Sequence, residues 1–138
     1  MRERWTRLLL AVLALTGLAL GAYATVAPRH YFEHFPGAGL HWVVADGPYN
    51  EHLMRDYGAL NLGLGVVAAC ALVWLTRRLV IATALGWLVY DIPHLLYHLF
   101  HLDVWDTADQ IGAVTGLLTI PIVCVGLLWL SRSLPARD

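Results

Sequence analysis

Residues 79–100 read LVIATALGWLVYDIPHLLYHLF, and this stretch determines the fold class. About 20 residues of apolar helix cross the hydrocarbon core of a membrane, and this run is long enough to do so. A segment inside a membrane must satisfy its backbone hydrogen bonds internally, so we expect a helix here. Its Asp and His residues all lie in its second half, at Asp91, His94 and His98. The stretch therefore predicts a transmembrane helix with a polar end.

Three further apolar runs have a similar length, at about residues 8–27, 57–76 and 111–130. The chain has 138 residues, of which 59% are hydrophobic and 14% charged, whereas soluble domains are about half apolar and a quarter charged. We therefore expect an all-α, integral membrane four-helix bundle. It forms a single domain over residues 1–138, with a long loop at 28–56 and the lipid bilayer as its surroundings. The net charge of −1 favours no nucleic-acid partner.

The arginines predict how the bundle is oriented. Cytoplasmic segments of membrane proteins carry an excess of Lys and Arg, and here every basic residue is Arg. We therefore expect the protein in the inner (cell) membrane with both termini in the cytoplasm. Seven of the nine arginines are then cytoplasmic. Residues 28–56 and 101–110 are then extracytoplasmic. The seven cytoplasmic arginines are Arg2, Arg4, Arg7, Arg77, Arg78, Arg132 and Arg137.

The first apolar run has a second interpretation. Arginines precede a Leu- and Ala-rich core, and Ala22-Tyr23-Ala24 resembles a signal-peptidase site. We favour a retained helix, because the run is as long as a complete span. Cleavage would leave three spans.

Asp91, His94, His98 and His101 form the most informative pattern, with spacings of three, four and three. At 3.6 residues per turn these side chains share one helix face. Ionisable side chains inside a membrane usually face the protein interior and mark function. On this orientation all seven histidines belong to the extracytoplasmic side, so we expect a functional site there. The other histidines are His30, His34, His41 and His52.

The neighbouring spans carry similar stripes. In the second span the stripe is expected to pack against a neighbour and to become polar toward its outer end. It contains Tyr49, His52, Asp56, Ala59, Gly63 and Cys70. In the fourth span, Asp109 precedes a GxxxG pair at Gly112 and Gly116, and the first span has another at Gly17 and Gly21. Such pairs allow close helix packing.

Two features are expected before the second span. A turn is expected at Pro36-Gly37, after a short interfacial helix. The second-span helix is expected to start around Pro48, above the membrane, with Glu51 and Arg55 paired one turn apart.

The leading hypothesis from these residues is a metal or small-ligand site in an outer pocket. Imidazole and carboxylate groups suit zinc, iron, manganese or copper, and two histidines four apart on a helix can hold one ion. The predicted ligands are His94, His98 and His101, with His52, Asp56 and Asp109 as auxiliary groups. Other expected pocket residues are Tyr49, Asn50, Glu51, Arg55 and Asp91.

Two alternatives remain at this point. Asp and His side chains could form a proton relay or a quinone or other ligand site. The polar groups could also simply hold the helices together in a non-catalytic subunit, which would bind another membrane protein or a second copy through its GxxxG faces.

Some motifs resemble a known family. Tyr31-Phe32 with Phe35-Pro36-Gly37, Pro48 to Leu53, Arg55-Asp56 and Pro93-His94 resemble a family of small, functionally uncharacterised four-helix membrane proteins of actinobacteria. That family is similar in layout to the wider DoxX-like group, of which some members are linked to quinone-dependent oxidation. The resemblance covers nearly the whole chain. It implies the four-helix fold, but it implies no activity of its own.

Overall fold

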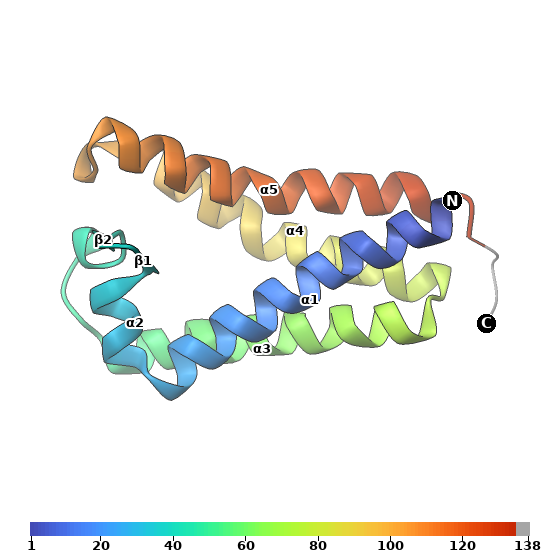
Figure 1. The fold of residues 1–138 in the computed structure, drawn as a ribbon, viewed down its shortest axis with the longest axis horizontal. Helices are drawn as coiled ribbons and strands as arrows, with labels where there is room; N and C mark the ends of the chain where they lie inside the picture. Colours follow the sequence, from blue (N-terminus) through green and yellow to red (C-terminus); the bar gives the residue numbers. More distant parts are fainter. Residues whose placement is uncertain (135–138) are drawn as a thin grey trace.

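The computed structural model describes residues 1–134, and these residues form an all-α bundle, as the sequence predicts (Figure 1). Four helices are long and apolar enough to cross a membrane, which makes this a multi-pass membrane protein. They are α1 (Arg2–Val26), α3 (Glu51–Trp74), α4 (Arg77–Leu99) and α5 (Thr107–Ser131). The predicted cytoplasmic Arg137 lies outside the described residues.

The connections gather at two opposite ends of the bundle (Figure 1). One end carries the N-terminus and the short α3–α4 turn. The other, which we call the loop end, carries residues 27–50 and 100–106. Its elements are α2 (Pro28–His34), the antiparallel strands β1 (Pro36–Gly37) and β2 (Leu40–His41), and the 3-10 turns η1 (Val44–Asp46) and η2 (Leu102–Val104).

Helix α3 starts later than the sequence predicts. Pro48 does not begin the helix; instead Asn50 caps it, and the Asn50 side chain accepts a hydrogen bond from Leu53 N at 3.1 Å. Asn is a preferred N-cap because its side-chain oxygen satisfies one of the free N–H groups of the first turn. The predicted Glu51–Arg55 ion pair forms, at 2.9 Å.

Glycines bring α1 and α3 into direct backbone contact. A Cβ atom added to Gly21 would lie 2.5 Å from Leu62 N, and one added to Gly65 would lie 2.6 Å from Leu18 N. The predicted packing role of the Gly17–Gly21 pair is therefore confirmed. The predicted α3 face is wrong, because the buried face carries Gly58, Asn61, Gly65, Ala68 and Ala71. Ala59 and Gly63 are exposed.

The apolar core fills only the half of the bundle far from the loop end. Leu10 and Leu13 of α1 pack there with Val80 of α4 and Leu127 of α5, and all four are fully buried. Trp87 closes this core toward the loop end. The other half of the bundle contains the buried Asn61, Asp91 and His98 and is hollow.

Candidate functional site

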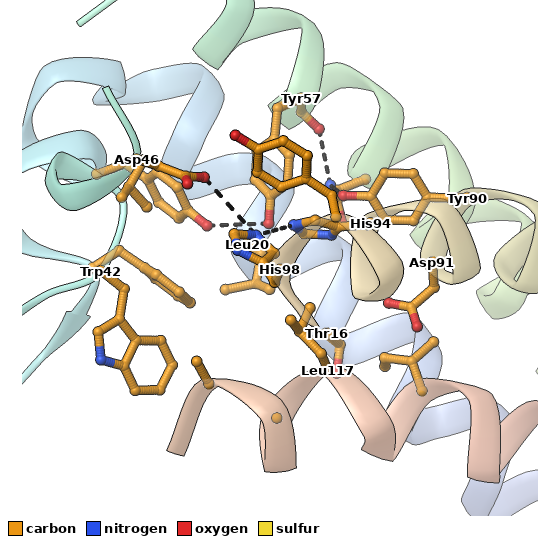
Figure 2. A pocket seen from close by; sticks show the side chains of 18 of the residues that line it. Thr16, Leu20, Trp42, Asp46, Tyr57, Tyr90, Asp91, His94, His98 and Leu117 are labelled. Carbon is orange, nitrogen blue, oxygen red and sulfur yellow. Dashed lines mark hydrogen bonds and ion pairs between the residues drawn. The ribbon is translucent and has the colours of Figure 1, made fainter. Parts of the chain in front are cut away.

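A cavity of about 630 Å³ lies between the helices in the loop-end half (Figure 2). Pockets for small molecules commonly enclose roughly 300–1,000 Å³ and combine apolar walls with a few polar groups. Side chains from α1, α2, α3, α4, α5 and residues 42–46 line this one. Most of its wall is aromatic or aliphatic, so the few polar groups determine what it can bind.

Helix α4 supplies Asp91, His94 and His98 to the cavity. The predicted stripe is confirmed for Asp91 and His98, which are both buried, and the same buried face continues through Trp87 to Ala84. Asp91 is only 3% exposed. Figure 2 shows Asp91 toward Thr16 and Leu117, whereas His98 lies toward Asp46 and Trp42. The polar groups therefore occupy two separate parts of the cavity.

The two histidines bond to each other. His94 Nε2 and His98 Nε2 are 3.0 Å apart. A hydrogen bond between two imidazole nitrogens needs one N–H and one bare nitrogen, so the pair holds one proton at this position. His98 Nε2 also lies 4.0 Å from Asp46 Oδ2, and its ring stacks on Trp105 with centroids 5.0 Å apart.

Three tyrosines and an asparagine form a network that the sequence reasoning missed. Tyr31 donates its hydroxyl hydrogen bond to the Tyr57 hydroxyl at 3.1 Å, and Asn61 Nδ2 donates to the Tyr90 hydroxyl at 2.9 Å. Burial raises the pKa of Tyr31, which lies outside the spans, so its phenol stays neutral. The spacing of Tyr57 and Asn61, one turn apart, was a usable signal. Asn61 thus joins α3 to α4 within the bundle.

Three buried polar atoms of residues in the cavity wall have no hydrogen-bond partner within residues 1–134: Asp91 Oδ2, Trp87 Nε1 and His98 Nδ1. Buried polar groups are nearly always paired in native proteins, so each exception needs an explanation. Asp91 and Trp87 lie one turn apart on α4, yet the structure does not pair them with each other.

The remaining predicted metal ligands lie elsewhere. His52 and Asp56 contact each other at 3.3 Å on the outside of α3, with side chains 86% and 63% exposed. His101 lies beyond the end of α4, is exposed, and its Nδ1 donates to Tyr97 O at 2.7 Å. Asp109 Oδ1 accepts a hydrogen bond from Trp42 Nε1 at 2.9 Å.

The predicted convergence of six ligands is thus not found. Over the described part of the chain, no group of three or more His, Cys, Asp or Glu side chains is placed to hold a metal ion. The physical reason is the glycine contact between α1 and α3, which turns the His52–Asp56 face away from α4. Helix rotation of this kind depends on tertiary packing, so the stripe in α3 could not reveal it.

Trp42, which donates the hydrogen bond to Asp109, is itself held in place by two further contacts. Its ring lies against Gly112, where an added Cβ would be 3.0 Å from Trp42 Cζ2, and its carbonyl accepts from Trp105 Nε1 at 3.2 Å. Gly116 instead borders the cavity, with no atom within 4 Å of an added Cβ. The predicted GxxxG packing of α5 is therefore replaced by one aromatic contact and one open position.

The other predicted pocket residues lie close to the cavity but outside it. Tyr49 and Asn50 line an adjacent hollow of about 560 Å³. Glu51 pairs with Arg55, and Arg55 Nη1 donates to Thr25 O at 2.7 Å. The contacts of Arg55 fasten the start of α3 to the end of α1. Asp91 is the one residue among the other predicted pocket residues that lines the cavity.

Comparisons of the chain with protein-family models, with curated proteins and with solved structures give no match. The resemblance to the actinobacterial family therefore stays a prediction. What the cavity can bind has to follow from its own side chains.

Proposed function

We propose that this protein resides in the cell (inner) membrane and binds a small, largely apolar molecule in the cavity between its helices. The observation that carries the proposal is the buried Asp91 carboxyl group, which borders this space without a partner among the described residues. A polar group of the ligand would supply that partner, and the aromatic walls would enclose the apolar part.

The main alternative is that the polar residues only hold the helices together. Asn61 and Tyr90 show how such a contact looks here, because they are hydrogen-bonded to each other across α3 and α4. Asp91 forms no such contact. An unpaired polar group buried in protein costs about 1–3 kcal/mol, and a charged one costs more inside a membrane. A purely structural role would leave that destabilisation uncompensated.

A small organic ligand is favoured over a metal ion by the state of the histidines. The cavity contains two imidazoles, His94 and His98, and their Nε2 atoms already bond to each other at 3.0 Å. An ion bound through both Nε2 atoms would have to break that bond. An organic molecule can form hydrogen bonds with the other polar groups of the cavity and leave the hydrogen bond between His94 and His98 intact.

The proposed orientation has both termini in the cytoplasm and the loop end outside. Arg2, Arg4 and Arg7 start α1, Arg77 and Arg78 start α4, and Arg132 follows α5. All these positions lie at the end of the bundle opposite the loop end (Figure 1). This agreement of three segments supports the positive-inside assignment. The cavity would then lie in the outer half of the membrane.

We would test the cavity with 2-naphthol, a neutral aromatic probe that has one hydroxyl donor. Binding to the protein in lipid nanodiscs is measured by equilibrium dialysis, with protein-free nanodiscs as background. We expect saturable binding to the wild type and loss of at least about tenfold in affinity for Gly116→Phe, because the new ring would occupy the cavity (about 1.4 kcal/mol per tenfold).

Gly63→Phe is the matched control. Gly63 is also exposed with no atom within 4 Å of an added Cβ, but it does not line the cavity. We expect wild-type affinity for this variant. Equal loss in both variants, or no saturable binding to the wild type, would contradict the proposal.

A further inference from the structure

We infer that the ligand is an organic cation, held by the Asp91 carboxylate and by aromatic side chains that line the same cavity. The inference rests on the proposed binding cavity and adds the chemical class of its ligand. It is built from the charges around the cavity, the arrangement of its aromatic rings and the position of Asp91 relative to the histidine pair.

The cavity wall is acidic and has no fixed positive charge. Its described lining residues include Asp46 and Asp91 but neither Arg nor Lys, and the whole sequence has no Lys. Asp46 is partly exposed to solvent, and its Oδ2 lies 4.0 Å from His98 Nε2. Asp91 makes neither an ion pair nor a hydrogen bond within residues 1–134, although it is 3% exposed. One acidic group in the cavity therefore lacks a counter-charge.

A neutral hydrogen-bond donor would satisfy one oxygen of Asp91 but would leave its negative charge buried. A proton can neutralise the carboxyl group when the cavity is empty. A bound cation neutralises it as well, and it gains the Coulomb attraction that a membrane interior screens only weakly. Among small organic ligands, a cation is therefore the class that Asp91 distinguishes best.

Aromatic rings that line the same cavity complete the site. Trp87 precedes Asp91 by one helical turn, and Tyr90 directly precedes Asp91 in the chain. The rings of Trp87 and Tyr90 meet edge to face, with their centroids 6.3 Å apart. The faces of Trp and Tyr rings attract cations, most strongly where water is excluded. Tyr57 lines the same cavity from α3. Rings that line one cavity together with a carboxylate are suited to ammonium groups with apolar substituents.

The histidines do not compete for this role. His94 and His98 are bonded to each other, and Figure 2 places His98 toward Asp46 and away from Asp91. No hydrogen bond or ion pair joins either histidine to Asp91 within the described chain. Tyr57 and Tyr90 contact the His94 ring as well, but Asp91 itself is not bonded to the histidine pair, and the cation is assigned to Asp91.

The test uses two probes of the same shape. The cation 2-naphthyltrimethylammonium and the neutral 2-tert-butylnaphthalene differ only in N⁺ against C. Both are measured by equilibrium dialysis against nanodiscs, with protein-free nanodiscs subtracted. We expect the wild type to bind the cation at least about tenfold more tightly than the neutral probe, as expected for a desolvated cation–π and carboxylate contact.

Asp91→Asn should remove most of this preference, because only the contribution of the aromatic rings remains. Asp46→Asn removes the same charge elsewhere in the cavity and should keep most of the preference. Equal binding of the two wild-type probes, or a preference that is as large in Asp91→Asn as in the wild type, would overturn the inference. If 2-naphthol still binds in that case, only the ligand class is wrong; if 2-naphthol also fails to bind, the cavity proposal fails too.

Discussion

Asp91 is the residue at which stability and proposed function are opposed. Its neighbours on α4 follow the ordinary rule for a buried helix face, with Ala84 and Trp87 in the core. Asp91 has the same burial but carries a carboxyl group without a partner in residues 1–134. A residue that costs stability in this way is expected to be retained for binding.

Replacing Asp91 by Leu should therefore stabilise the empty protein. We expect the free energy of unfolding to rise by about 1–3 kcal/mol, because an unpaired buried polar group is removed. Thermal unfolding in detergent, followed by circular dichroism, measures the change as a higher midpoint temperature.

Asn61→Leu is the control at the same scale. Asn61 is buried and bonded to the Tyr90 hydroxyl at 2.9 Å, so its loss should lower stability by about 1 kcal/mol. If Asp91→Leu were destabilising to a similar extent, Asp91 would be a structural contact, and the cavity would lose its main support.

At the scale of single elements, the α1–α3 contact determines which side chains can face the cavity. Gly17 and Gly21 of α1 meet Gly58 and Gly65 of α3 with their backbones in contact. This contact fixes the rotation of α3, so that Tyr57 and Asn61 face the cavity while His52 and Asp56 face outward. It also occupies the GxxxG face of α1, which is then not available to a partner protein.

Gly21→Leu should disrupt the bundle, since even its Cβ would lie 2.5 Å from the backbone nitrogen of Leu62. Overpacking of this kind typically costs 1–3 kcal/mol or more, and a backbone neighbour cannot move aside. Unfolding by SDS titration measures the loss.

Gly63→Leu provides the comparison, because an added Cβ there meets no atom within 4 Å. It should unfold close to the wild-type midpoint. A similar loss in both variants would mean that glycine is needed in α3 for a reason other than the contact with α1.

For the whole molecule, the arrangement predicts a topology that can be measured. The N-terminus and the α3–α4 turn are at one end, and residues 27–50 and 100–106 are at the other (Figure 1). If the arginine-rich end is cytoplasmic, the loop end faces outward with the cavity behind Trp42 and Asp46.

Single-cysteine labelling tests this orientation. After both native cysteines, Cys70 and Cys124, are replaced by Ala, a membrane-impermeant maleimide added to intact cells should label Ala38→Cys in the hairpin. Arg78→Cys, in the first turn of α4, should react only after the cells are opened. The reverse pattern would place the cavity in the cytoplasmic half of the membrane.

The helical class, the four spans and the polar end of α4 can all be predicted from the sequence. These follow from local properties, namely the length of an apolar run and the periodicity of a single helix. In the structure, one face of α4 is buried from Ala84 to His98. The tertiary structure alone decided which polar residues meet. His52, Asp56, His101 and Asp109 matched the pattern but lie elsewhere, whereas Tyr31, Tyr57 and Tyr90 line the cavity. The reason is physical: periodicity gives each helix a face, but the direction of that face depends on backbone contacts between helices, such as those of Gly21 and Gly65.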